Sequence, residues 1–377
     1  MKALARQEAG AERVALLDLV REYQSSRVEL LAACERVLDR MHLLGGEEVR
    51  AFETEMAAYL GVHHVRGVAS GTDALLLALL AAGVGPGDEV LVQANAFIAA
   101  VEAIHAAGAT PIAVDIRSED LGPDPDDLAA HVSPRTRAIL VVHLHGLPVE
   151  LAPILSLAAS HQLLVIEDCS HAHGATLDGR KVGSFGVAGA FSLGVVKNLA
   201  AYGDAGLVST DDAGVAERVR LLGTHGQVQK NDHEFFGMNS RLDELQAAML
   251  RVKLRRLDVR NERRSAIAAY YGERLGNVVV PPPDSPRRRH VYHQYVVRTP
   301  ARDALRAHLA AEEIDTGIHY PLPIHRQPAW VRAYGETPAL PRAEQAAREM
   351  LSLPVHADLT DLEVERVADA VAGFFRG

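Results

Sequence analysis

Apolar and polar positions follow two different periods along the chain as far as Arg241. Segments in which apolar residues recur every three or four positions, such as 47–60, predict amphipathic helices. Short runs such as 139–142 (Ile-Leu-Val-Val) are apolar throughout and predict strands that are covered on both faces. Strands that alternate with helices over short links indicate an α/β fold with a largely parallel sheet. Helices are expected at 13–40, 47–60, 73–82, 98–107, 126–131, 151–161 and 213–222, and strands at 89–93, 110–115, 138–143, 163–167, 188–193 and 206–210.

The pattern changes after Arg241. A long, arginine-rich helix is expected over residues 242–275, and the proline-rich segment 280–286 follows it. We therefore expect a large domain over residues 1–252 and a smaller α+β domain over residues 253–377. The elements expected in the smaller domain are a strand at 294–297, helices at 303–312, 343–351 and 361–375, and a proline-rich loop at 321–328.

Composition narrows the class of protein. The formal net charge of −10 argues against general nucleic-acid binding, although an anionic small molecule could still bind in a locally basic pocket. Mean hydropathy is close to zero and no apolar run is long enough to span a bilayer, so no membrane association is expected. Two cysteines make no disulfide framework and the first residues lack a signal-peptide core, which favours the cytoplasm. Residues 1–12 are expected to be frayed.

Lys197 is one of only five lysines, and a stretch of small and apolar residues from Ala190 to Val196 precedes it. Burial disfavours the charged ammonium, and a neutral amine can attack a carbonyl carbon. Lys197 is therefore a candidate for Schiff-base formation. A loop lysine that reaches solvent is the alternative, and this stretch alone does not exclude it.

Two further segments carry candidate binding groups. Ser70-Gly71-Thr72-Asp73 opens a predicted helix, where backbone N–H groups and the helix dipole favour an anion such as phosphate. The same residues also form a Ser-x-x-Asp capping arrangement, which is a purely structural alternative. Asp168 follows the apolar strand 163–167, and ligands of α/β sheets gather at the carboxyl ends of strands. It could pair with a protonated ring nitrogen or simply serve as a turn carboxylate.

These three features share one chemistry. Pyridoxal phosphate (PLP) requires an anion site for its phosphate, an acid beside its pyridinium nitrogen and a lysine that forms a Schiff base with it. The helix start at Gly71, Asp168 and Lys197 occur in this order along the chain. Their joint occurrence is more specific than any one of them, so we expect PLP as the cofactor and no metal.

At this point the chain resembles the DegT/DnrJ/StrS family of PLP-dependent nucleotide-sugar aminotransferases. The resemblance implies a fold-type-I, aspartate aminotransferase-like structure with a mostly parallel seven-stranded sheet and a smaller C-terminal α+β domain. It runs from about residue 14 to the C-terminus. The matching stretches are 67–75, 85–90, 165–174, 191–199, 203–204, 239–248 and 319–321.

The resemblance also implies a role for each matching residue. Lys197 forms the Schiff base and moves protons, and Asp168 keeps the pyridinium nitrogen protonated. Asn239 implies a phosphate contact from a neighbouring subunit, and hence a homodimer with shared sites; a loop or cap asparagine is the alternative. The other implied contacts are Gly71, Thr72 and Ser192 to the phosphate, Phe97 to the ring face, His171 in place of a common glutamine, and Tyr320 and His325 to the substrate, with core or turn roles open for Phe97, Tyr320 and His325.

The implied reaction is transfer of an amino group from L-glutamate to a keto-sugar nucleotide. Segments 203–204 and 239–244 most resemble enzymes that aminate C3 of a dTDP-3-keto-6-deoxyhexose in deoxyaminosugar biosynthesis. Amination at C4, of a UDP-sugar or of a keto-cyclitol stays open. A dehydratase branch of the family has histidine at the lysine position, so Lys197 argues against it. A non-catalytic, regulatory PLP-binding protein is the alternative from another class.

Overall fold

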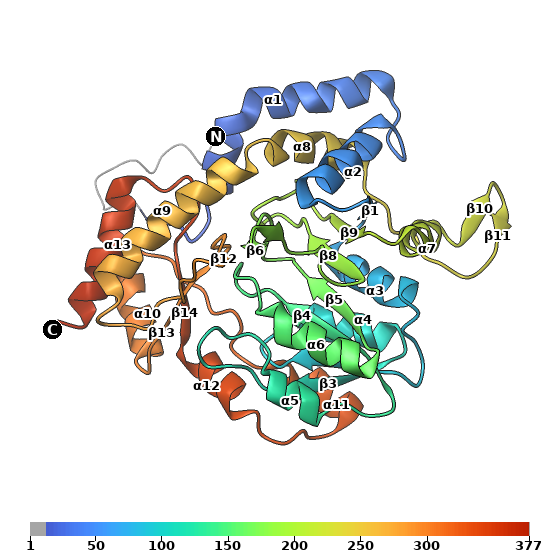
Figure 1. The fold of residues 1–377 in the computed structure, drawn as a ribbon. Helices are drawn as coiled ribbons and strands as arrows, with labels where there is room; N and C mark the ends of the chain where they lie inside the picture. Colours follow the sequence, from blue (N-terminus) through green and yellow to red (C-terminus); the bar gives the residue numbers. More distant parts are fainter. Residues whose placement is uncertain (1–12, 377) are drawn as a thin grey trace.

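The computed structural model describes residues 13–376, so the expectation for residues 1–12 lies outside the described part. A seven-stranded sheet forms the centre of the molecule (Figure 1). Its strands are, in spatial order, β1 (His64–Val68), β9 (Gly206–Thr210), β8 (Ala188–Ser192), β5 (Leu164–Asp168), β4 (Thr136–Val142), β2 (Glu89–Gln93) and β3 (Thr110–Val114).

The strands from β8 to β3 all run parallel, and only β9 runs antiparallel to its two neighbours, β8 and β1. The predicted α/β fold with a largely parallel sheet is therefore confirmed. The carboxyl ends of β5 and β8 lie side by side, because Asp168 is in register with Ala190. Polar residues that follow these two strands are brought to one edge of the sheet.

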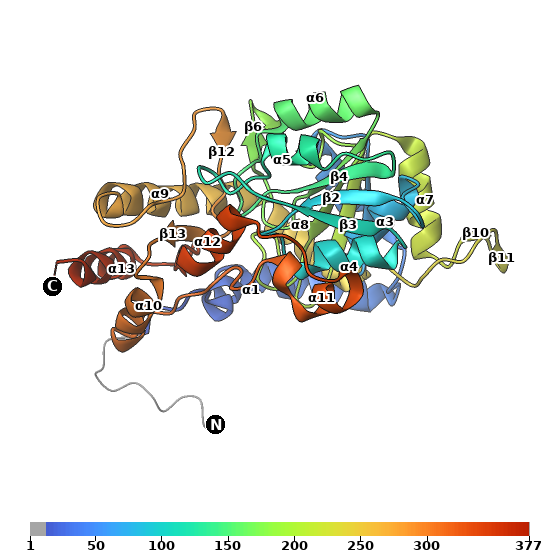
Figure 2. The ribbon, with the colours of Figure 1, turned by 90° about the horizontal axis from the view of Figure 1, so that it is seen from below.

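Helices cover both faces of the sheet, which explains the uniformly apolar strands (Figure 2). Val90 and Val92 of β2 pack in one core cluster, and Leu91 between them packs in another on the opposite face. One face carries α3 (Gly71–Ala81), α4 (Ile98–Ala106) and α7 (Ala213–Gly223), and the other carries α2 (Glu47–Leu60), α5 (Pro125–Ala130), α6 (Leu151–His161) and α8 (Glu244–Leu254).

The C-terminal part has a core of its own around a two-stranded antiparallel sheet. Val14 joins this core from the other end of the chain, through a bridge to Ile314. The division of the chain into two domains after residue 252 stays a prediction. Trp330 and Ala343 lie after this point in the sequence, yet they pack into the core of the large sheet. The elements here are α9 (Leu257–Leu275), β13 (Tyr295–Arg298), α10 (Arg302–Ala311), η1 (Ile324–Arg326), α11 (Pro328–Tyr334), α12 (Pro341–Glu349), β14 (Met350–Leu353) and α13 (Asp361–Phe374).

Short strands complete the fold outside the main sheet. A hairpin between Gln227 and His233 projects from the body of the molecule (Figure 1). No period-2 pattern in the sequence predicts these two- and three-residue strands. They are β6 (Thr176–Leu177), β7 (Arg180–Lys181) and β12 (Arg288–Arg289) in one small sheet, and β10 (Gln227–Gln229) and β11 (Asp232–His233) in the hairpin.

Three predicted helices differ from the structure, two at one end and one in its middle. The helix expected at 13–40 begins only after Asp18, whose side chain caps α1 (Leu19–Arg40). The helix expected at 242–275 breaks at Arg255 and Arg256, because α8 packs on α1 and α2 whereas α9 packs on α13. The helix expected at 343–351 ends at Glu349, and the apolar residues that follow pair with β13 as a strand.

No helix among the described residues is long and apolar enough to cross a membrane.

Candidate functional site

A cavity of about 370 Å³ lies at the carboxyl ends of β5 and β8, beside the start of α3. We call it the site cavity. It brings together residues that lie up to 250 positions apart, from Ser70 to Tyr320. The predicted site residues that line it are Gly71, Thr72, Phe97, Asp168, His171, Ser192, Lys197 and Tyr320.

The start of α3 forms one wall of the site cavity. Ser70 caps the helix by accepting a hydrogen bond from the backbone N–H of Asp73. The Ser240 hydroxyl in turn donates to the Asp73 carboxylate at 2.6 Å, which holds this end of the helix in place. The exposed N–H groups of the first turn therefore face the cavity in a fixed orientation and favour an anion there.

Gly71 lets α3 approach β8 closely, and we expect its replacement by alanine to destabilise the protein. A Cβ at this position would lie 2.8 Å from the Cα of Ser192, where no side chain can give way. The expected loss in the free energy of unfolding is about 1–3 kcal/mol, measured by chemical denaturation. The control is Gly272→Ala inside α9, where a Cβ meets nothing within 4 Å and stability should rise by about 0.5 kcal/mol. Equal stability of the Gly71 variant and the wild type would contradict the close packing.

Asp168 is the last residue of β5 and is only 5% exposed. One carboxylate oxygen accepts a hydrogen bond from the backbone N–H of Ser170 at 3.0 Å. The Ser170 hydroxyl accepts from the backbone N–H of Ser192, so the ends of β5 and β8 are tied together. Among residues 13–376 the second oxygen of Asp168 has no hydrogen-bond donor, which leaves it able to accept one from a ligand.

Lys197 follows a turn closed by a hydrogen bond from its own N–H to the carbonyl of Gly194. Desolvation lowers its pKa to about 8, while the negative charge of Asp168 acts in the opposite direction. A substantial share of the amine is therefore neutral near pH 8 and able to act as a nucleophile or base. Lys197 is half-buried and lines the site cavity, so its side chain is not that of a fully exposed loop lysine.

Because the folded state disfavours its charge, Lys197 costs stability at neutral pH. Its pKa is about 8 when folded and 10.5 in the unfolded chain, so the unfolded chain binds more protons between these values. Stability of the cofactor-free protein should therefore rise with pH across this window. We expect Lys197→Met to be more stable than the wild type at neutral pH by about 1–3 kcal/mol, with the difference shrinking toward pH 10.5. Denaturation at a series of pH values measures this, and a pH-independent difference would contradict it.

His171 lies over the same cavity among other histidines. Its ring centre is 4.4 Å from that of His293 and 6.1 Å from that of His145. Burial, together with the charge of Lys197, keeps its pKa well below the usual value, so the ring is neutral. Its Nε2 lies 3.4 Å from the Tyr320 hydroxyl, and its buried Nδ1 has no partner among the described residues. A neutral imidazole with one free nitrogen can still exchange a hydrogen bond with a ligand.

Phe97 and Tyr320 close the cavity on the side of α4. Their ring centres are 5.1 Å apart with a tilt of 37°. Phe97 directly precedes α4 and is 47% exposed, which is unusual for a core phenylalanine. Burial and the charge of Asp168 raise the pKa of Tyr320, so its hydroxyl stays protonated. An apolar ring face is thus available to a flat ligand.

Two predicted residues lie outside the site cavity. Asn239 is exposed and forms a bridge with Thr224 beside the projecting hairpin. Its predicted role requires a second copy of the chain. His325 has a fully buried side chain whose Nε2 lies 3.1 Å from the carboxylate of Glu344. The geometry gives His325 a structural contact with α12 and no access to the cavity, so the expected substrate contact finds no support.

The structure also brings in residues that the sequence did not indicate. His293, Gln294 and His319 line the cavity from the C-terminal part of the chain, about 100 positions or more after Lys197. His319 donates or accepts a hydrogen bond with Ser352, and His145 bonds the carbonyl of His319. The only hint in the sequence that this segment belongs to the site is its high density of histidines between residues 290 and 325. No spacing rule links these histidines to Lys197.

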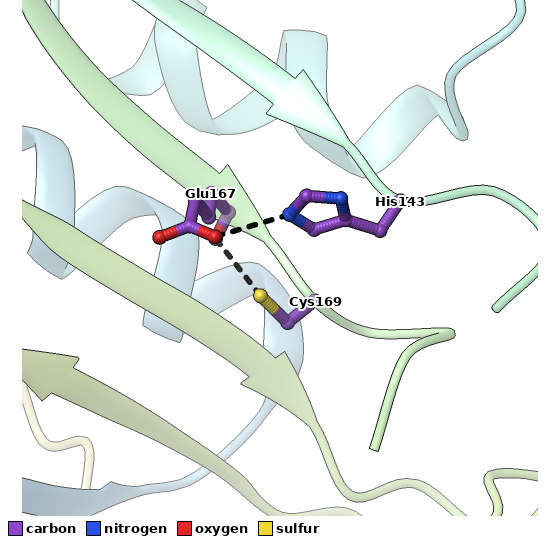
Figure 3. Close-up of side chains that lie close together, drawn as sticks. All are labelled: His143, Glu167 and Cys169. Carbon is purple, nitrogen blue, oxygen red and sulfur yellow. Dashed lines mark hydrogen bonds and ion pairs between the residues drawn. The ribbon is translucent and has the colours of Figure 1, made fainter. Parts of the chain in front are cut away.

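His143, Glu167 and Cys169 lie close together behind the cavity (Figure 3). Burial opposes ionisation of Glu167, but hydrogen bonds from His143, Gly183 and Gly186 outweigh it and lower its pKa. The backbone N–H of Val149 donates to Nδ1 of His143, so Nε2 carries the proton that bonds Glu167. Both groups are thereby saturated, and the cluster is built to hold the ends of β4 and β5 rather than a metal.

A larger cleft, of about 880 Å³, lies between α9 and the proline-rich segment 281–286. It contains no buried lysine, and the guanidinium groups of Arg287 and Arg288 are paired with Asp178 and Asp120. The smaller site cavity is therefore the better candidate of the two for chemistry, because its lining combines a desolvated amine with a carboxylate oxygen that has no donor among the described residues.

Comparison with known proteins agrees with this site. A profile of the DegT/DnrJ/EryC1/StrS aminotransferase family matches residues 24–372. A dTDP-3-amino-3,4,6-trideoxy-alpha-D-glucose transaminase from Streptomyces venezuelae is 46% identical over 368 residues, which cover 96% of each chain. A pleiotropic regulatory protein from Geobacillus stearothermophilus is 41% identical, covering 96% of this chain and 99% of its own.

Two solved structures are similar over nearly the whole chain. The crystal structure of S. venezuelae DesV in complex with a ketimine intermediate has a TM-score of 0.94 and 45% identity, covering 96% of this chain and 98% of its own. The structure of ntda from Bacillus subtilis with its bound cofactor PMP has a TM-score of 0.91 and 29% identity, covering 99% and 87%. These likenesses confirm the predicted aminotransferase fold.

Proposed function

Because this chain belongs to the DegT/DnrJ/EryC1/StrS aminotransferase family, we propose that it uses PLP to transfer an amino group from L-glutamate to a keto-sugar nucleotide. The sugar proposed is a dTDP-3-keto-6-deoxyhexose, aminated at C3 during deoxyaminosugar biosynthesis. The observation that carries the proposal is the amine of Lys197, largely desolvated within the same cavity as the buried carboxylate of Asp168.

The residues of the site cavity fit PLP. Within residues 13–376 the second oxygen of Asp168 has no donor and the buried Nδ1 of His171 has no partner, so both can bond a heteroaromatic ligand. The capped start of α3, packed on Ser192 through Gly71, presents N–H groups to an anion. When bound, PLP supplies an electron sink that lets the carbon bearing the amine lose its proton.

Each side chain then has a defined task. Asp168 holds a proton on the ring nitrogen, because a buried carboxylate stabilises a neighbouring positive charge. Gly71, Thr72 and Ser192 would hold the phosphate, His171 would offer a hydrogen bond to the ring hydroxyl, and Phe97 would lie against the ring. Lys197 binds the cofactor and then moves a proton to and from the amine-bearing carbon. Tyr320 is placed to contact the substrate.

A panel of keto-sugar nucleotides with L-glutamate tests the substrate proposal. We expect a 3-keto dTDP-sugar to give the highest kcat/KM, and the product to carry its new amine at C3 by NMR. Preference for a 4-keto sugar, a UDP-sugar or a keto-cyclitol would replace the proposed substrate with another of this family. Relatives named for dTDP-sugar transamination support the first choice.

A non-catalytic, PLP-binding regulatory role is the second candidate, and the relative named as a pleiotropic regulatory protein favours testing it. L-Glutamate is added to the PLP-loaded protein, and the visible absorption band and released 2-oxoglutarate are followed. Loss of the band with stoichiometric 2-oxoglutarate supports catalysis. A band that stays unchanged with every amino donor would support the regulatory role instead.

We further propose that the active unit is a homodimer in which each site takes Asn239 from the other chain. Asn239 is exposed beside a hairpin that also presents the fully exposed Phe236. If sites are shared, mixing and reassociating Lys197→Ala and Asn239→Ala proteins should restore activity, because hybrid dimers contain one intact site. Random reassociation predicts about a quarter of wild-type activity. Light scattering gives the mass, and a monomer or an inactive mixture of two inactive variants would contradict the proposal.

A further inference from the structure

Arg264, in the middle of α9, is a buried cation with no ion-pair partner among residues 13–376, although the charges of Glu22 and Asp358 act on it from further away. It is 5% exposed, and no carboxylate lies within 4 Å of its guanidinium among residues 13–376. Its hydrogen bonds there all come from Nη1, to the carbonyls of Tyr292 at 3.1 Å and Val355 at 3.4 Å. Burial lowers its pKa to about 10, which still leaves the group charged at neutral pH. A buried charge without a counter-ion is costly and points to a missing anion.

The neighbouring Arg260 shows what a satisfied arginine looks like on this helix. It lies one turn earlier and forms two hydrogen bonds to the carboxylate of Asp358, at 3.0 Å and 2.6 Å. Asp358 is thereby occupied by Arg260. Both arginines lie on the same helix and both are largely withdrawn from solvent. They differ in that Arg260 pairs with a carboxylate and Arg264 does not.

The space in front of Arg264 is a cavity of about 150 Å³ with no acidic residue in its lining. We call it the arginine cavity. It shares Val196, His293, Gln294 and His319 with the site cavity, so the two meet at these side chains. Gln294 also lines both cavities, and no hydrogen bond joins its side-chain Nε2 to another described residue. This N–H group can therefore donate to an anion in the same region as the guanidinium.

His293 lies between the two cations. The charges of Lys197 and of Arg264 both add to burial in lowering its pKa, so its ring is neutral and cannot supply an anion. A ligand that enters from the site cavity and ends in a carboxylate would provide the missing charge. A guanidinium binds a carboxylate through parallel N–H bonds, and Nε and Nη2 of Arg264 donate no hydrogen bond to the part of the chain that the structure describes.

We propose that Arg264 and Gln294 form a carboxylate subsite that selects the amino donor, by binding the carboxylate of L-glutamate that is remote from its amine. This inference rests on the proposed aminotransferase function and specifies how that site chooses its donor. The amine of glutamate meets the reacting centre beside Lys197, and its side chain extends past His293 to the arginine cavity.

The test compares two donors that differ only in the remote group. L-Norvaline has the carbon chain of L-glutamate without the second carboxylate. The amine-donating half-reaction is followed with each donor in the wild type, Arg264→Gln and Arg264→Lys. Arg264→Gln should lower kcat/KM for glutamate by about 30-fold or more, mainly through KM, and leave norvaline unchanged. Arg264→Lys should fall between, because it keeps the charge and loses the planar fork.

Arg260→Gln is the matched control. It removes an arginine of the same helix and an ion pair, so it should lower thermal stability without changing the ratio of the two donors. Calorimetric titration with glutarate, against butyrate, adds a readout that needs no turnover. Glutarate should bind the wild type and Arg260→Gln, and lose at least about tenfold in affinity in Arg264→Gln.

The outcomes separate the possibilities. If folded Arg264→Gln keeps the wild-type ratio of kcat/KM for glutamate to that for norvaline, the subsite is overturned. Equal losses in kcat/KM for both donors would leave this ratio unchanged, and they are the result expected of a purely structural arginine. If the wild type itself gives no half-reaction with glutamate, the proposed function fails. The glutarate titration still decides the subsite in that case, because binding does not depend on transamination.

Discussion

Lys197→Ala is expected to lower kcat by about four orders of magnitude or more, because the variant loses both a nucleophile and a general base. The structure makes Lys197 effective in both tasks. Desolvation lowers its pKa to about 8, and it shares a cavity with Asp168. Turnover is measured with glutamate and the keto-sugar nucleotide at saturation. Mass spectrometry after borohydride reduction should find the cofactor attached to Lys197 in the wild type and nowhere in the variant.

The control for this change is Lys181→Ala. Lys181 also has a pKa lowered by burial, but its ammonium lies 3.9 Å from the ring centre of Tyr59, outside the site cavity. Its loss should leave kcat within about twofold of the wild type. Full activity of Lys197→Ala, or an equal loss in Lys181→Ala, would rule out the assigned role. The thermal stability of both variants shows whether a loss of activity reflects unfolding.

The second large effect is expected for Asp168→Asn, which should lower kcat by about 100-fold to 1000-fold. Asparagine keeps the hydrogen bond from Ser170 and the shape of the side chain, but it removes the charge and puts an NH2 donor in place of the free oxygen. Without that charge a protonated ring nitrogen loses its buried counter-ion, which costs about 3–4 kcal/mol at a site of this kind. Steady-state turnover with both substrates measures the effect.

The same substitution has a signature in the cofactor-free protein. The charge of Asp168 raises the pKa of Lys197 against the larger effect of desolvation. Removing it should therefore lower that pKa further below about 8, as measured by the pH dependence of amine labelling. Asp178→Asn, which removes an exposed partner of Arg287, is the control and should change neither quantity. An unchanged pKa of Lys197 in Asp168→Asn would show that the two groups do not interact.

The apolar pattern predicts six of the seven strands of the large sheet, because the residues of each strand reflect their own burial, and it misses β1 (His64–Val68). Residues 139–142 are apolar at every position, and the structure buries alternate ones against opposite helical layers. The long helix over 242–275 fails for the opposite reason. Nothing local marks a break at Arg255 and Arg256, and only the packing of α8 on α1 and of α9 on α13 separates the two halves.

The order of a helix start, an acid and a lysine along the sequence indicates PLP chemistry, and family motifs name the residues. That order does not reveal which groups share a cavity. His325 and Tyr320 lie five positions apart in one loop, yet Tyr320 enters the cavity and His325 turns to Glu344. The direction in which a loop side chain points depends on the residues that pack against it. The neighbouring sequence says little about which residues those are.

By itself the sequence determined the fold class and the type of chemistry and named Lys197 as the candidate Schiff-base lysine, since periodicity and motif order are properties of the linear chain. Only the tertiary structure decided how far that amine is desolvated, that His171 is neutral, and that Arg264 lies buried without an acid beside a cavity next to the site. The physical reason is that desolvation and charge pairing depend on atoms from many segments at once. Packing of the sheet against α9 brings four residues into two adjoining cavities: Lys197, Asp168, His293 and Arg264.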